Sequence, residues 1–249
     1  MAVTRLDTIN NIVNRAAVGV GFDPVADVLS NNNNAFTQLS YLLTDCLQEL
    51  MEMYPWEILN RTYSYTTVGN EAGILSLPAD FAYMIPQTGW ERSKSVPLAG
   101  PLSPQEWTYL LGRNLVGSTI YASFRLDQDS INILPNDPTP AGLNITFEYI
   151  SRNLIEIATA AGTYTDTAVG ASSSDIVQLP PNLIVAMLKL RFLDAKGFDT
   201  TSAERSFNQI YTSLAGKNHS SRILNVAGRS NRFPYLNNVW NLPDTNYGS

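Results

Sequence analysis

The longest unbroken helical pattern in this chain runs from residue 34 to residue 57, and it constrains the fold more than any other segment. At about 100° per residue, its apolar side chains fall on one face. That face is formed by Phe36, Leu39, Leu42, Leu43, Cys46, Leu47, Leu50, Met53 and Tyr54. The opposite side carries Asp45, Glu49 and Glu52. An amphipathic helix of this kind is not stable alone in water, so other segments must cover its apolar face.

Three further segments show helical spacing and can supply that cover. They are residues 4–17, 182–196 and 201–214. The second of them is apolar on two sides, because Ile184, Leu188 and Phe192 lie nearly opposite its other leucines. We predict that these three residues form an interface with a neighbouring subunit. Burial between two layers of the same molecule is the alternative, and the pattern favours neither.

Between the helical segments the sequence alternates with a period of two, which is typical of strands. The predicted strands cover residues 61–67, 74–77, 119–126, 130–134 and 143–150. Residues 155–174 are rich in Ala, Gly, Thr and Ser and are predicted to form an exposed loop or a long protruding hairpin. The predicted fold class is α+β. It is a helical bundle of N-terminal helices and a C-terminal helical hairpin, with an inserted antiparallel β-region and an extended C-terminal arm.

The predicted domains follow these changes in period. Residues 1–60 and 176–225 form the helical bundle, residues 61–175 the β-rich region, and residues 226–249 the arm. The arm has no period, but it is richer in aromatic residues than a flexible tail usually is. We expect it either to dock on a partner or to fold back over its own domain. The residues expected to make this contact are Arg229, Arg232, Phe233, Tyr235 and Trp240.

No combination of residues in the sequence indicates catalysis or a metal site. The single histidine, His219, lies in a polar run, and the single cysteine, Cys46, lies on the apolar side of the central helix. Asp127 and Asp129 fit a hairpin turn better than a calcium loop, because EF-hand spacing does not follow them. We therefore expect no cofactor, no metal and no enzymatic activity.

Charge and hydropathy argue against two further classes of protein. The net charge is −6 and the pI about 4.8, which disfavours non-specific nucleic-acid binding, since that depends on Lys and Arg. Only 15% of the residues are charged, which suits either extensive protein–protein contact or an ordinary β-rich surface. The sequence predicts neither a signal peptide nor a membrane span.

Several short motifs occur in a characteristic order. They are Leu-Asp-Thr-Ile-Asn-Asn-Ile at 6–12, a Gly-Pro turn at 19–25, Tyr-Pro-Trp-Glu at 54–57, Leu-Pro-Ala-Asp-Phe at 77–81, and Leu-Pro-Pro at 179–181. As an ordered set covering roughly residues 4–225, they resemble the tail tubular protein A family. That family comprises the head-to-tail adaptors of short-tailed bacteriophages.

The resemblance implies a structural virion protein in the neck of the phage, made in the host cytoplasm. Twelve copies would form a ring that joins the portal protein to the tail nozzle protein, with tail fibres as further partners. DNA would pass through the ring without specific binding, and no membrane would be involved. The resemblance also implies that the arm contacts the portal. It makes Asp45, Glu49 and Glu52 candidates for an acidic channel lining, with a solvent-facing position elsewhere as the alternative.

Two other functions remain open at the level of sequence. The Tyr and Trp content also suits a tail or fibre-base module that recognises carbohydrate. A virion-associated peptidoglycan hydrolase would need two carboxyl groups on either side of the scissile bond, a geometry that sequence does not reveal.

Overall fold

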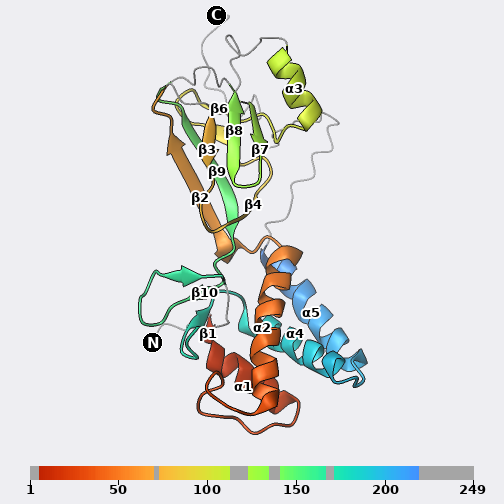
Figure 1. Ribbon diagram of the computed structural model, residues 1–249. Coiled ribbons are helices and arrows are strands. Elements are labelled where there is room, and N and C mark those ends of the chain that lie inside the picture. Colours follow the sequence, from red (N-terminus) through yellow and green to blue (C-terminus); the bar gives the residue numbers. More distant parts are fainter. Residues whose placement is uncertain (1–5, 70–72, 113–122, 135–140, 167–170, 219–249) are drawn as a thin grey trace, which may run out of the picture. The chain divides into compact units, whose positions relative to one another are not determined.

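The computed structural model describes residues 6–69, 73–112, 123–134, 141–166 and 171–218 (Figure 1). The α-helices in this part are α1 (Ile9–Gly19), α2 (Asn34–Met53), α3 (Pro104–Gly112), α4 (Pro181–Ala195) and α5 (Thr201–Asn218). The predicted central helix is confirmed as α2. It begins after Asn33, whose side chain accepts a hydrogen bond from the Ala35 N–H at 3.0 Å, and Pro55 follows its end.

The strands of the described residues form three antiparallel sheets. They are β1 (Asp7–Thr8), β2 (Asn60–Thr66), β3 (Ile74–Ser76), β4 (Phe81–Met84), β5 (Trp90–Glu91), β6 (Val96–Pro97), β7 (Ser123–Leu126), β8 (Ser130–Leu134), β9 (Asn144–Ser151), β10 (Ile155–Glu156), β11 (Tyr164–Thr165) and β12 (Ile176–Val177). The sheet orders are β1-β12-β10-β11, β2-β9-β5-β6 with β4 also on β9, and β3-β8-β7. The predicted hairpin across 127–129 is confirmed by the pairing of β7 with β8.

The predicted fold, a helical bundle with an inserted β-region, is wrong. The protein is a mixed α+β structure with substantial sheet, and its helices do not form a bundle of their own. Ile155 of β10 and Val177 of β12 are fully buried in the same core as the helices. Residues 155–174, predicted as an exposed loop or hairpin, therefore contain part of a core sheet. Their strands are two residues long, which is too short to show an alternating pattern.

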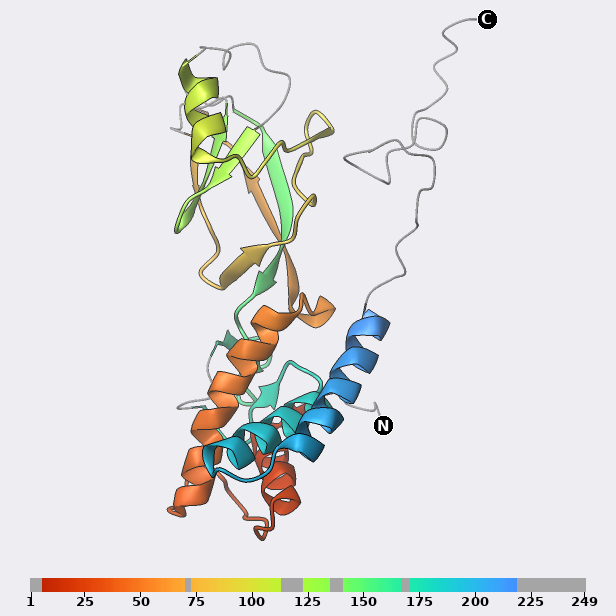
Figure 2. The ribbon, with the colours of Figure 1, turned by 90° about the vertical axis from the view of Figure 1, so that its right-hand side faces the viewer.

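Helix α4 lies at the centre of the helical layer and contacts α1, α2 and α5 (Figure 2). Its sequence is apolar nearly all round, which is typical of a helix that is buried on more than one side. Ile184 and Leu188 are fully buried and Phe192 is 2% exposed. These residues pack inside the single chain, as the alternative reading of the two-sided pattern proposed.

A second core lies between the sheet containing β9 and the sheet containing β8. Ile145 and Phe147 of β9 alternate toward it and meet Ile131 and Ile133 of β8. Phe147 also stacks on Tyr63 of β2, with ring centroids 4.7 Å apart. Two antiparallel sheets thus bury their inner faces against each other, as in a small sandwich.

Candidate docking surfaces on the helical layer

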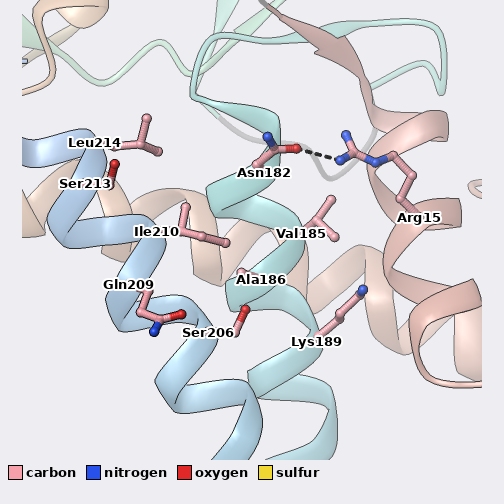
Figure 3. Close-up of a pocket in the computed structure, with 10 residues that line it drawn as sticks. All are labelled: Arg15, Asn182, Val185, Ala186, Lys189, Ser206, Gln209, Ile210, Ser213 and Leu214. Carbon is pink, nitrogen blue, oxygen red and sulfur yellow. Dashed lines mark hydrogen bonds between the residues drawn. The ribbon is translucent and has the colours of Figure 1, made fainter. Parts of the chain in front are cut away.

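An open groove runs between α4 and α5 and has a cavity volume of about 520 Å³ (Figure 3). Its floor is apolar and consists of Val185 and Ala186 from α4 with Ile210 and Leu214 from α5. Polar residues line its sides, namely Arg15, Asn182, Lys189, Ser206, Gln209 and Ser213. Among the described residues, the lining includes two cations and no carboxylate. We call this surface the α4–α5 groove.

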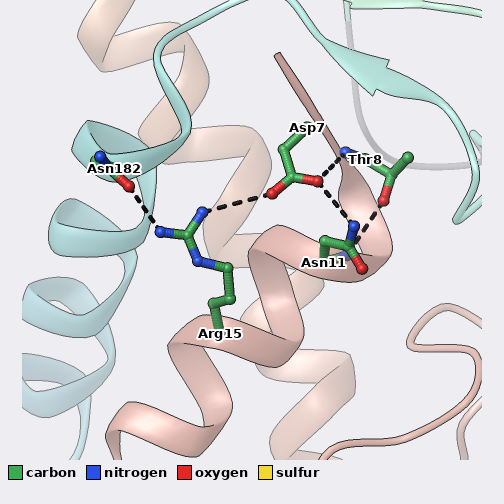
Figure 4. Close-up of polar contacts among 5 residues, drawn as sticks. All are labelled: Asp7, Thr8, Asn11, Arg15 and Asn182. Atoms are coloured by element: carbon green, nitrogen blue, oxygen red, sulfur yellow. Dashed lines mark hydrogen bonds and ion pairs between the residues drawn. The ribbon is translucent and has the colours of Figure 1, made fainter. Parts of the chain in front are cut away.

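Arg15 is held at one end of the α4–α5 groove by contacts to two elements (Figure 4). Its Nη2 donates to Asn182 Oδ1 at 2.6 Å, and its Nη1 lies 3.4 Å from Asp7 Oδ2. The Asp7 carboxylate also accepts from the Asn11 side chain at 2.8 Å and from the Thr8 N–H at 2.9 Å. The guanidinium therefore has a fixed position between the start of α1 and the start of α4, while remaining exposed to solvent.

Lys189 lies across the junction of α1 and α4. A Cβ placed on Gly19, the last residue of α1, would clash with Lys189 Cε, so the lysine stem passes directly over that glycine. The ammonium is thus close to the C-terminal end of α1, where the helix dipole favours a cation. Lys189 forms no ion pair within the described residues. A second hollow of about 510 Å³ continues past it along α1, where Val18 is 54% exposed.

The three acidic residues predicted as a channel lining have two different environments. Asp45 and Glu52 are exposed on the outer face of α2 and make no ion pair within the described residues. Glu49 is bound by Arg191 of α4, and this hydrogen bond raises the pKa of Arg191. The charge of Glu49 is therefore already neutralised by a cation of the same chain.

The other predicted site residues are placed as follows. Ile184, Leu188 and Phe192 lie in the chain's own core, which leaves their side chains no exposed surface for a subunit contact. Arg229, Arg232, Phe233, Tyr235 and Trp240 lie outside the described residues, as does His219. The predicted contact of the arm stays a prediction.

The described residues contain no reactive thiol, no metal-binding cluster and no helix that could span a membrane. Cys46 is fully buried, and burial raises the pKa of its thiol to about 12, so it is a poor nucleophile. Among the described residues, no group of three His, Cys, Asp or Glu side chains could hold a metal ion. In the same part of the chain, no helix is both long and apolar enough to cross a membrane.

Sequence reasoning missed the α4–α5 groove and its two cations. The available signal was the spacing of Asn182, Val185, Ala186 and Lys189, which recur at i, i+3, i+4 and i+7 on one face of α4. That face is less apolar than the rest of the helix, but the abundance of leucine around it hides the contrast. The predicted C-terminal hairpin does place α5 beside α4, but no local pattern shows that Arg15 of α1 completes the groove.

Compared with protein-family models, the chain matches none, and no curated protein matches it either. Its function must therefore be inferred from its own residues.

Proposed function

We propose that this chain is a structural virion protein, a head-to-tail adaptor that forms a ring between the portal and the tail nozzle of a short-tailed phage. The order of sequence motifs supports this proposal. One structural observation also supports it: the helical layer carries two different exposed surfaces, an acidic face on α2 and the cation-lined α4–α5 groove. A closed ring requires two different surfaces that complement each other, because each copy must contact two neighbours in the same direction.

The proposed partners are the portal protein, the nozzle protein, tail fibres and further copies of this chain, with the twelve copies per ring that the resemblance implies. In this proposal the low fraction of charged residues reflects a molecule that is largely covered by neighbours in the virion. The net charge of −6 would let DNA pass through the ring without adhering to it. The C-terminal arm, residues 226–249, is proposed to contact the portal.

The experiment that tests the proposed function is a binding measurement with the cognate portal. Native mass spectrometry of the full chain, alone and mixed with portal rings, gives the number of copies bound per ring. We expect a stoichiometry of one copy per portal subunit, and loss of binding when residues 229–249 are deleted. Far-UV circular dichroism of the deletion variant controls for its folding.

Two results would count against this proposal. A wild-type chain that does not bind the portal would contradict the adaptor function itself. A deletion variant that binds as well as wild type would contradict only the role of the arm. Binding to a glycan array, or turnover of purified cell wall that is lost in Glu-to-Gln variants, would favour the carbohydrate-binding or hydrolase alternatives.

A further inference from the structure

We propose that the outer face of α2 in one copy of this chain docks into the α4–α5 groove of a second copy. The occupant of the groove is thus another copy of the same protein. This inference rests on the proposed ring function and names the two surfaces that would form its repeating contact.

The outer face of α2 is a single exposed ridge. Thr37, Tyr41, Asp45, Gln48 and Glu52 follow one another at intervals of three or four residues and are all exposed. Residues at this spacing lie on one side of a helix. The ridge therefore presents one aromatic ring, which is 60% exposed, and two carboxylates without an ion-pair partner in the described residues. We call it the acidic ridge.

The α4–α5 groove complements the acidic ridge in charge and in polarity. Arg15 and Lys189 supply two cations on one side; Asp7 pairs with Arg15, whereas Lys189 has no ion-pair partner within the described residues. Val185 and Ile210 give the floor an apolar surface that can receive an aromatic ring such as Tyr41. Buried aromatic anchors usually contribute most of the energy of a protein–protein contact, while opposite charges at the rim favour the correct partner.

The two surfaces point in opposite directions. On α4, Arg191 faces α2, as its bond to Glu49 shows, whereas Asn182 and Lys189 lie about half a turn away. On α2, the acidic ridge lies opposite the buried face. A contact between such surfaces cannot be satisfied within one molecule or by a simple two-fold pair. It is heterologous, so it propagates from copy to copy and can close a ring.

Charge reversal on each surface tests this contact. The groove variants are Lys189→Glu, which reverses a charge, and Gln209→Glu, which introduces a negative one; the ridge variants Asp45→Lys and Glu52→Lys both reverse a charge. Each is expected to raise the concentration needed for assembly on portal rings by about tenfold, because it places like charges opposite each other. Arg205→Glu on α5 and Glu57→Lys beyond α2 are matched controls outside both surfaces and should change assembly less than about threefold. Thermal unfolding of every variant checks that it is folded.

Restoration provides a sharper readout than loss. A chain that combines Lys189→Glu with Asp45→Lys or with Glu52→Lys should assemble within about threefold of wild type, since the reversed groove then meets a reversed ridge. A mixture of the separate groove and ridge variants should also assemble, with the two chains alternating. Loss without restoration in every combination would overturn the proposed pairing of surfaces.

A portal-independent experiment separates failure of this inference from failure of the proposed function. In a Cys46→Ala background, one chain carries Gln48→Cys on the ridge and a second, tagged chain carries Ser213→Cys in the groove. Air oxidation of the concentrated mixture should yield the mixed disulfide at least about tenfold above a control pair in which Gln128→Cys replaces the ridge cysteine. Portal binding without the mixed disulfide and without effects of charge reversal would overturn the docking while preserving the adaptor. Failure to bind the portal would contradict the adaptor, and the cross-link would still decide whether the two surfaces meet.

Discussion

Arg191 of α4 donates from one guanidinium nitrogen to both carboxylate oxygens of Glu49 in α2. The pair joins α4 to α2 at the margin of the apolar contact between these two helices. Both side chains remain about 40% exposed, at 41% for Arg191 and 40% for Glu49. Water therefore screens the attraction, and exposed pairs of this kind contribute roughly 0.2–1 kcal/mol.

The ion pair predicts a small but measurable coupling energy. We expect Glu49→Gln and Arg191→Met each to lower the free energy of unfolding by less than about 1 kcal/mol, and the double variant to lose less than the sum. Urea unfolding of the four proteins in a double-mutant cycle measures this. Glu52→Gln, which changes an unpaired acid on the same helix, is the control and should leave stability unchanged. Strict additivity would show that the pair contributes nothing.

Trp56 predicts a much larger effect on stability. Its side chain is 2% exposed, and its Nε1 donates to the Leu50 carbonyl oxygen at 2.7 Å, which caps the last turn of α2. We expect Trp56→Ala to cost about 3–5 kcal/mol through the lost packing. Trp56→Phe keeps most of the ring and should cost about 1–3 kcal/mol, because the carbonyl loses its donor.

Denaturant unfolding with circular dichroism as the probe gives these values. Tyr41→Ala removes an aromatic ring that is 60% exposed on α2 and is the matched control, expected to change stability by less than about 0.5 kcal/mol. Equal losses for Trp56→Ala and Tyr41→Ala would contradict the structural role of Trp56.

The elements that the sequence predicted are those in which a periodic pattern of apolar residues repeats over many residues. In α2 the apolar residues recur at helical spacing from Phe36 to Leu50, and the face that they form is buried. The strand predicted over residues 143–150 is confirmed as β9 (Asn144–Ser151), because Ile145 and Phe147 alternate with polar residues. The sheet beside the helices was missed. Its strands pair residues distant in sequence, such as Asp7 with Val177, and a two-residue strand has no period of its own.

The candidate site was predictable only in part. The exposed acids Asp45 and Glu52 follow from the helical wheel of α2, but the pairing of Glu49 does not, since Arg191 lies 142 residues away in sequence. The two-sided helix α4 was correctly described as apolar, yet sequence could not state what would cover each side. The α4–α5 groove exists only because α1, α4 and α5 stand side by side, which is a property of the tertiary structure.

Glu91 predicts how stability depends on pH at the acid end. This residue is 2% exposed, and its carboxylate accepts from the N–H groups of Ser93, Lys94 and Asn144 at 2.9, 2.7 and 3.0 Å. Burial raises the pKa of Glu91, but the hydrogen bonds from these residues outweigh it, and the pKa is lowered from its ordinary value of 4.5. The carboxylate therefore stabilises the fold above pH 4.5, and this stabilisation is lost as the pH falls through the lower pKa of the folded state.

The variant Glu91→Gln tests this pH dependence. At pH 7 we expect it to lose about 1–3 kcal/mol of stability, because an amide nitrogen would face backbone N–H groups that need an acceptor. The difference from wild type should begin to shrink below pH 4.5, where the unfolded chain takes up a proton, and should vanish once the pH passes the lower pKa of the folded state and the wild-type carboxylate is itself protonated. Glu57→Gln, at an exposed position, is the control. A difference that stays constant down to acid pH would show that Glu91 acts only through packing.

Cys46 predicts that the native protein resists thiol reagents. The side chain is fully buried on the core face of α2, so reagents do not reach its sulfur. Burial also raises the pKa of the thiol from 9.0 to about 12, so very little of it is the reactive thiolate at pH 8. Labelling should then require global unfolding. We expect it to be at least about a thousandfold slower than labelling of Gln48→Cys in a Cys46→Ala background, which places the only thiol on the exposed face of the same helix. Urea should accelerate the reaction of Cys46 in proportion to the unfolded fraction. Rapid labelling without denaturant would mean that α2 separates from the helical layer under native conditions, and the acidic ridge could not then be a rigid surface.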